Sequence, residues 1–342
     1  MSDALKPLLA CLVGGERLDG GGLELAFGEI MEGAATAAQI GAFLTAMLPH
    51  MTDPEALATG ARALRSRMVT VSAPAGAVDV CGTGGDGAHT LNISTAVALV
   101  LAGCGVPVAK HGNRAMSSRS GGADVLEALE VKLTGDPATL ERCLAEANVA
   151  FLFAQNHHPA MRNVAAPRRE LAFRTIFNLL GPLSNPAGVT RQLVGVFAPQ
   201  YVAPMAEALH LLGAERAWVV HGAGGLDELS CNGANEVAVL DDDGVRVKSI
   251  TAADANAPTA ANADVHGGSA MENADALVAL LERRAEGSAY DSFVQFNAAA
   301  ALVVSGRAAT LAEGAALARE SLSSGRALET LRKLVAITQA AP

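Results

Sequence analysis

One stretch of the sequence, residues 77–109, alternates between strand and helix patterns and constrains the fold more than any other. Ala77–Cys81 is a short buried-strand pattern followed by glycines, Ser94–Ala102 has the length and apolar character of a helix, and Val106–Ala109 is a second strand. A strand, a helix and a strand within about 30 residues form a βαβ unit, whose two strands lie parallel. The pattern recurs at 193–220, so we expect an α/β fold with a mainly parallel central sheet.

The first 68 residues carry a different pattern. Apolar residues recur there at three- and four-residue intervals without strand-like alternation, which predicts helices alone. Phe173–Leu180, closed by turns, resembles a lone helix that we expect to pack with them. Because single cores stop growing at about 250–300 residues, a chain of 342 residues is expected to form two domains. The remaining predicted elements are an extended linker at 69–75, a hairpin at 236–250 and helices at 273–285, 290–304, 310–321 and 326–338.

The net charge, the cysteine spacing and the length of the apolar runs disfavour several classes of protein. The 35 acidic and 25 basic residues give a net charge of −10, which argues against broad nucleic-acid binding, since that needs a basic face. The five cysteines are widely spaced and form no Cys-x-x-Cys pair, which favours a reduced cytoplasmic protein without a disulfide framework. The longest apolar run, 96–105, is too short to cross a bilayer, and no signal peptide is evident. We therefore expect a cytoplasmic protein with neither a nucleic-acid nor a membrane partner.

A glycine-rich segment directly follows the first predicted strand. Gly82, Gly84 and Gly87 satisfy the pattern G-x-G-x-x-G, so a dinucleotide site has to be considered. That site needs an acidic residue about 20 positions further on, where this chain has Lys110 and His111. The chain also lacks the Gly-Lys-Ser/Thr of a Walker A loop. Taken alone, the segment could be a glycine turn without a ligand.

The residues after this loop favour an anion. No aspartate or glutamate occurs from Gly87 to Ala123, whereas Lys110, Arg114 and Arg119 do. The predicted helix start at 92–95 offers free backbone N–H groups and the positive end of the helix dipole. The carboxyl ends of neighbouring parallel strands face one crevice, so both loops should meet there. The sequence predicts a polyphosphate site in this crevice.

Two further clusters suggest a metal ion and an acidic substrate. Asp227-Glu228 follows the predicted strand Ala217–Val220, and adjacent carboxylates at a strand end are natural Mg²⁺ ligands when phosphates share the ion; a solvated acidic turn is the alternative. The planar guanidinium of arginine can form two hydrogen bonds to a carboxylate, so one arginine of a basic cluster could hold an acidic substrate. His157 and His158 are adjacent on an extended segment, so joint metal ligation is not expected. That basic cluster comprises Arg162, Arg168, Arg169 and Arg174.

Long contiguous motifs resemble those of the anthranilate phosphoribosyltransferases, in that family's order and over nearly the whole chain. They are Gly-Thr-Gly-Gly-Asp-Gly-x-x-Thr-x-Asn-Ile-Ser-Thr (82–95), Lys-His-Gly-Asn-Arg-Ala-x-Ser-Ser (110–118), Ala-Asp-Val-Leu-Glu-Ala-Leu (123–129), Arg-Thr-Ile-Phe-Asn-Leu-Leu-Gly-Pro-Leu (174–183) and Gly-Leu-Asp-Glu-Leu-Ser (225–230). The resemblance implies a small helical domain at 1–70 with an inserted segment at 166–186, a larger α/β domain at 75–165 and 187–342, and a homodimer joined through the helical domains.

The resemblance also implies the site residues. Mg²⁺ would be held by Ser94, Asp227 and Glu228, and anthranilate would be contacted by Gly82, Asn113 and Arg168. Lys110, Asn113, Arg114 and Arg168 are the implied catalytic residues. The implied phosphoribosyl pyrophosphate site comprises Gly82, Gly85, Asp86, Thr90, Asn92, Ile93, Ser94, Thr95, Lys110, His111, Gly112, Asn113, Arg114, Ala115, Met116, Ser117, Ser118 and Gly122.

The implied reaction, a step of tryptophan biosynthesis, is attack of the anthranilate amine on C1 of the ribose, which expels pyrophosphate. An aromatic amine is neutral at pH 7, so catalysis rests on stabilising the leaving group by Mg²⁺, Lys110 and Arg114 and on orienting the acceptor by Arg168 and Asn113.

The sequence departs from the family pattern at a few positions and leaves two other functions open. Gly122 stands where Ser or Ala is usual, Glu130 replaces a helix-ending glycine, and Ala172-Phe173 replaces glycine and an aliphatic residue. A pyrimidine-nucleoside phosphorylase resembles this fold but would not need Asp227-Glu228. Nucleic-acid-binding relatives of the fold are disfavoured by the charge and by having only two tyrosines and one tryptophan.

Overall fold

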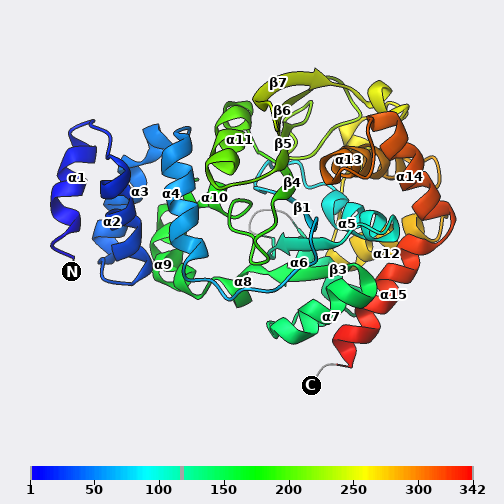
Figure 1. Ribbon diagram of the computed structural model, residues 1–342, viewed down its shortest axis with the longest axis horizontal. Coiled ribbons are helices and arrows are strands. Elements are labelled where there is room, and N and C mark those ends of the chain that lie inside the picture. Colours follow the sequence, from blue (N-terminus) through cyan, green and yellow to red (C-terminus); the bar gives the residue numbers. More distant parts are fainter. Residues whose placement is uncertain (1, 116–118, 341–342) are drawn as a thin grey trace.

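The computed structural model, which describes residues 2–115 and 119–340, is built around a seven-stranded sheet (Figure 1). The strand order is β3-β2-β1-β4-β5-β6-β7. The first five of these strands in that order are parallel, and the last two run antiparallel as a hairpin. The prediction of a mainly parallel sheet is confirmed. The strands are β1 Val78–Gly82, β2 Val108–Gly112, β3 Val149–Phe153, β4 Arg191–Gly195, β5 Arg216–His221, β6 Asn235–Asp241 and β7 Gly244–Ile250.

Two features of the sheet differ from expectation. The second strand begins at Val108 rather than Val106, because Pro107 has no N–H to give to the ladder; its carbonyl accepts from Val78 N instead. The strand also continues to Gly112 rather than ending at Ala109, so Lys110 and His111 lie within it. The edge strand β3 was not predicted, since an apolar run of five residues cannot be assigned by periodicity alone.

Each face of the sheet belongs to a separate apolar core. Along β4, Leu193 faces a core shared with helices α5 and α13, whereas Val194 faces the core that includes α11 and the N-terminal helices. This alternation is the two-residue period of a strand buried on both faces. The helices of the larger part are α5 Ile93–Gly103, α6 Gly122–Ala128, α7 Pro137–Ala147, α8 Ala154–His157, α11 Val202–Leu211, α12 Ala270–Leu281, α13 Ala289–Ser305, α14 Leu311–Ser323 and α15 Arg326–Gln339.

The N-terminal helices form one end of the molecule, as Figure 1 shows. The starts of the second, third and fourth of these helices are capped by side-chain oxygens: Asp19 accepts from Gly22 N, Thr36 forms a capping box with Gln39, and Asp53 accepts from Glu55 N. The helices are α1 Leu5–Val13, α2 Gly20–Met31, α3 Ala37–Ala46 and α4 Pro54–Arg65.

A later segment completes this helical end. Helix α9, Arg162–Leu171, contacts α2 and α3, and α10, Phe177–Leu180, contacts α4. Phe27 packs edge-on against Phe177 with ring centroids 6.1 Å apart. Phe173–Leu180 therefore packs with the N-terminal helices as expected, although only its last turn is helical. The domain bounds given above remain a prediction. No helix within 2–115 or 119–340 is long and apolar enough to span a membrane.

Candidate active site

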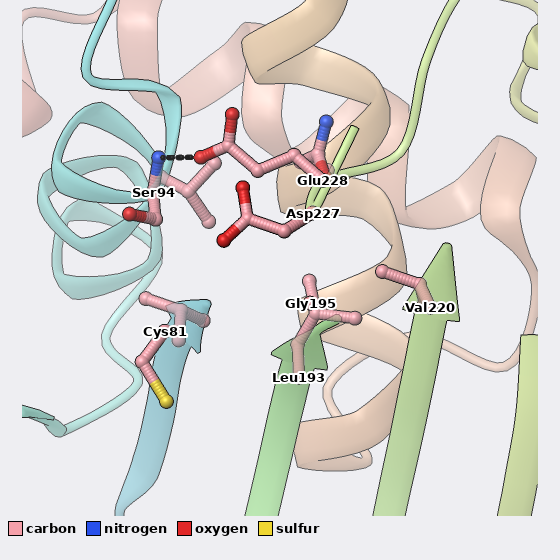
Figure 2. Close-up of a pocket in the computed structure, with 10 residues that line it drawn as sticks. Cys81, Ser94, Leu193, Gly195, Val220, Asp227 and Glu228 are labelled. Atoms are coloured by element: carbon pink, nitrogen blue, oxygen red, sulfur yellow. Dashed lines mark hydrogen bonds between the residues drawn. The ribbon is translucent and has the colours of Figure 1, made fainter. Parts of the chain in front are cut away.

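The acidic pair Asp227-Glu228 lies in the loop after β5, across the carboxyl ends of the central strands. Figure 2 shows both carboxylates pointing toward the first turn of α5. Glu228 Oε1 accepts a hydrogen bond from Ser94 N at 2.9 Å, and Asp227 Oδ2 accepts one from Gly84 N at 2.7 Å. The pair therefore bridges the start of a helix and the glycine loop, which the sequence predicted would meet at this edge.

The pKa values of both carboxylates are raised. Burial raises the pKa of Asp227, and the Asp86 carboxylate raises it further. Burial also raises the pKa of Glu228, and Asp227 adds to this shift. Two neighbouring acids in a half-buried crevice are the oxygen donors that Mg²⁺ prefers, and a bound cation would favour their ionised forms. Among residues 2–115 and 119–340, no three His, Cys, Asp or Glu side chains form a metal site, so an ion here would also need phosphate or water oxygens.

Three glycines let the acidic loop pass close over the strand ends. Gly82 of β1 and Gly195 of β4 are directly paired, and Gly222 follows β5. A Cβ on Gly195 would overlap the carbonyl oxygen of Asp227, one on Gly222 would overlap that of Glu228, and one on Gly82 would strike the Asp227 carboxylate. Gly195 was missed from the sequence, although a glycine inside a strand pattern is a sign of close backbone approach.

The glycine loop itself is held in an open turn. Gly84, Gly85 and Gly87 have φ angles of 67°, 74° and 77°, a left-handed conformation that favours glycine. Asp86 accepts from Ala88 N through Oδ1 at 3.0 Å and from Asp227 N through Oδ2 at 3.3 Å, so it ties the loop to the acidic pair.

Lys110 approaches the helix start from the buried side. It is 5% exposed, and its Nζ donates to Val80 O at 2.7 Å and to Ser94 Oγ at 3.1 Å. Burial lowers the pKa of Lys110, and Asp79 opposes that shift. Lys110 thus orients the Ser94 hydroxyl and adds positive charge beneath the helix N-terminus.

His111 faces away from that helix. Its Nδ1 lies 3.1 Å from Gly181 O, and its Nε2 lies 3.2 Å from His158 Nε2. Burial lowers the pKa of His111 to about 3 and that of His158 to about 4, so both are neutral near pH 7. His157 instead places Nδ1 2.8 Å from Val69 O, so the adjacent histidines contact different partners.

The remaining residues predicted for the phosphoribosyl pyrophosphate site differ in their contacts and burial. Asn92 Oδ1 accepts from Asn273 Nδ2 at 2.8 Å, and Thr90 bridges to His266, whereas the side chains of Ile93 and Thr95 are buried. Gly112 lies against Phe151, Ala115 N donates to Asp124, and Gly122 begins α6. Met116, Ser117 and Ser118 lie outside the described residues.

Arg114 is not a free cation in this structure. Its guanidinium pairs with Asp124 at 2.9 Å and with Glu127, and lies over the Phe153 ring. The stretch without acidic residues ends at Ala123, and the first two acidic residues after it, Asp124 and Glu127, are the ones that pair with Arg114. Asn113 Oδ1 accepts from Arg114 N at 2.8 Å.

Arg168 and Arg169 take different environments on α9. Arg168 is half-buried, with its guanidinium 5.8 Å from the Phe177 ring, and burial lowers its pKa. Within the described chain, no carboxylate pairs with it. Arg169 is exposed. The sequence could not separate the two, and the structure distinguishes them by their burial.

Arg174 connects the inserted segment to the glycine loop, a contact the sequence did not predict. Its Nη2 donates to Gly85 O, and its guanidinium lies 4.2 Å from the Phe197 ring centroid. The helical end of the molecule therefore touches the loop directly.

The departures from the family pattern have structural counterparts. Glu130 and Ala172 have φ angles of 65° and 53°, so each places a side chain in the left-handed conformation that glycine adopts at helix ends. A Cβ on Gly122 would lie 3.2 Å from Thr95 Oγ1, so glycine relieves crowding there.

Comparison with known proteins gives a consistent result. The glycosyl transferase family helical bundle domain matches residues 6–68, and the glycosyl transferase family a/b domain matches 75–328. Anthranilate phosphoribosyltransferase of Methylocella silvestris is 53% identical over 333 residues, covering 97% of this chain and 95% of that protein. The Rhizobium meliloti enzyme of the same name is 51% identical over 341 residues, covering 100% of both.

Solved structures agree. Anthranilate phosphoribosyltransferase from Thermus thermophilus superposes with a TM-score of 0.92 at 40% identity, covering 99% of this chain and 100% of that one. The Saccharomyces cerevisiae enzyme, solved in complex with PRPP and Mg, gives 0.91 at 26% identity, covering 99% of each.

Proposed function

The chain belongs to the anthranilate phosphoribosyltransferase family, and from that premise we propose the reaction of its crevice. It transfers the phosphoribosyl group of 5-phosphoribosyl 1-pyrophosphate to the amine of anthranilate, a step of tryptophan biosynthesis. The observation that carries the proposal is the placement of Asp227-Glu228 beside the N–H groups of Ser94 and Gly84. A helix start, a glycine loop and paired carboxylates in one crevice suit a polyanion that shares a divalent cation.

In this reaction the amine nitrogen forms a bond to C1 of the ribose while the bond from C1 to the pyrophosphate oxygen breaks. The nitrogen then loses a proton to solvent, and the electron pair of the broken bond leaves with pyrophosphate. Burial raises the pKa of the Cys81 thiol well above its usual range, so no thiolate nucleophile is available beside the crevice. Catalysis would therefore rest on positioning and on stabilising the leaving group.

We propose that Ser94, Asp227 and Glu228 hold Mg²⁺ in this crevice. The support is that these three residues line one cavity and that Lys110 holds the Ser94 hydroxyl. When bound, the ion would neutralise charge on the pyrophosphate. The donor would occupy the loops at 82–95 and 110–122, with Arg114 exchanging its partners Asp124 and Glu127 for phosphate.

Loss of anthranilate fluorescence on addition of phosphoribosyl pyrophosphate tests the function. We expect the signal to fall with Mg²⁺ present and to stay constant when EDTA replaces it, because the donor and the acidic pair both need the cation. Phosphorolysis of thymidine or uridine without anthranilate consumption would favour the nucleoside phosphorylase alternative, and tight DNA binding at moderate salt would favour the nucleic-acid-binding one.

Arg168 is the residue we propose to hold the anthranilate carboxylate. Because a charge-assisted hydrogen bond contributes roughly 1.5–3 kcal/mol, Arg168→Ala should raise the KM for anthranilate by about 10-fold or more. The donor KM should stay within about twofold, since Arg168 lies on α9 rather than on the donor loops. Arg169→Ala, an exposed neighbour, is the matched control and should change neither constant. An effect of Arg168→Ala on the donor KM alone would refute the role.

We also propose a homodimer joined through the helical ends. That end exposes apolar side chains, including Val13 at 74%, Leu25 at 44% and Leu48 at 39%, which fits a protein contact. Light scattering should give twice the chain mass of 34.7 kDa. Val13→Glu should shift the mass toward one chain. A wild-type mass of one chain would contradict the proposal.

We place the protein in the cytoplasm. The five cysteines are all free in the structure, which fits a reducing compartment.

A further inference from the structure

Asn297, a buried residue of α13, binds the backbone directly after the acidic pair. It is 3% exposed and lines the same cavity as Asp227 and Glu228. Its Oδ1 accepts from Leu229 N at 2.9 Å, and its Nδ2 donates to Leu229 O at 2.8 Å. One side chain therefore satisfies both backbone polar groups of the residue that follows Glu228.

The orientation of the Asn297 amide is fixed by its own helix. Nδ2 also donates to Phe293 O at 2.9 Å, one turn earlier in α13. Burying an amide is costly unless its hydrogen bonds are made, and here all three partners are backbone groups. The side chain is thus held as a rigid connection between α13 and the loop that carries the acids.

The same helix also holds the other half of the crevice. Tyr290 lies two turns before Asn297, on the same side of α13, and its hydroxyl donates to Asn92 O at 3.3 Å. Asn92 is the N-cap of α5, two residues before Ser94. Helix α13 therefore contacts the backbone just before Ser94 and the backbone just after Glu228, so it sets the separation between them.

We propose that Asn297 is a positioning residue of the metal site. It fixes the Leu229 backbone so that the carboxylates of Asp227 and Glu228 converge beside the start of α5. The glycines beneath the loop allow it to approach the strand ends, and Asn297 determines where it stops. This inference rests on the proposed Mg²⁺ site.

Direct Mn²⁺ binding, followed by electron paramagnetic resonance with phosphoribosyl pyrophosphate present, tests the inference. Loss of a residue that supports a metal ligand typically weakens metal binding by 10–100-fold, so Asn297→Leu should weaken Mn²⁺ binding by about 10-fold or more. In Asn297→Asp the carboxylate can still accept from Leu229 N but cannot donate to Leu229 O or Phe293 O, so this variant should also weaken Mn²⁺ binding. In kinetics, the Mg²⁺ activation constant should rise while the anthranilate KM stays within about twofold.

Ser321→Ala is the matched control. It removes one buried hydrogen bond, from Ser321 Oγ to Val100 O at 2.9 Å, far along α5 from its start. It should lower the melting temperature without changing Mn²⁺ affinity. Unchanged Mn²⁺ affinity in both Asn297 variants, or equal losses in Ser321→Ala, would overturn the inference. Failure of the proposed function would appear differently, as absence of anthranilate consumption by the wild-type protein.

Discussion

Gly195→Ala is expected to reduce kcat/KM for phosphoribosyl pyrophosphate by about 100-fold or more, because a displacement of roughly 1 Å at a reacting site costs that much. The alanine Cβ would overlap the carbonyl oxygen of Asp227. Both groups belong to the backbone, and β4 is paired on both sides, so the acidic loop has to move. Steady-state kinetics at varied donor and Mg²⁺ concentrations measure the effect.

Gly20→Ala is the control for this substitution. Gly20 begins α2, is exposed, and has nothing within 4 Å of an added Cβ, so its activity should equal that of the wild type. If Gly195→Ala does not fold, Gly82→Ala replaces it. The closest group to a Cβ on Gly82 is the Asp227 carboxylate, which can move, and the Asp227 backbone lies further away. Wild-type kinetics in a folded Gly195→Ala protein would show that the acidic loop is not part of the reaction.

The double variant Asp227→Asn, Glu228→Gln is the second large expected effect. It keeps the shapes of both side chains but removes the charge that would hold the cation, and should lower kcat by about 10²–10³-fold, the cost of losing one strong electrostatic contact to a transition state. Since burial raises the folded-state pKa of both acids, their ionised forms destabilise the fold at pH values above the unfolded pKa. The melting temperature at pH 8 should therefore stay constant or rise.

Asp242→Asn with Asp243→Asn makes the same charge change in an exposed turn and should leave activity intact. The account fails if the double variant at 227 and 228 keeps its Mg²⁺ response, or if it loses activity only in step with a lowered melting temperature.

The fold was predictable wherever a local pattern was strong. Helices of the N-terminal and C-terminal segments, the first βαβ unit and the hairpin all follow from periodicity and turn residues. The edge strand β3 and helix α7 were missed, since a short run of apolar residues does not distinguish strand from buried helix.

The site was predictable in its components but not in its contacts. The glycine loop, the helix start and Asp227-Glu228 meet because strand ends in a parallel sheet share one edge. The contacts of Gly195 and Asn297 depend on which distant backbone passes beside them. A glycine inside a strand pattern signals a close approach but does not identify the segment that approaches. The pairing of Arg114 with Asp124 and Glu127 likewise depends on the path of a loop.

The most direct test of the account counts pyrophosphate released against anthranilate consumed by the wild-type protein. With Mg²⁺ and phosphoribosyl pyrophosphate present, we expect one pyrophosphate for each anthranilate lost and neither change in EDTA. Pyrophosphate release without anthranilate loss, or no reaction of anthranilate in a folded protein, would contradict the assignment of this crevice.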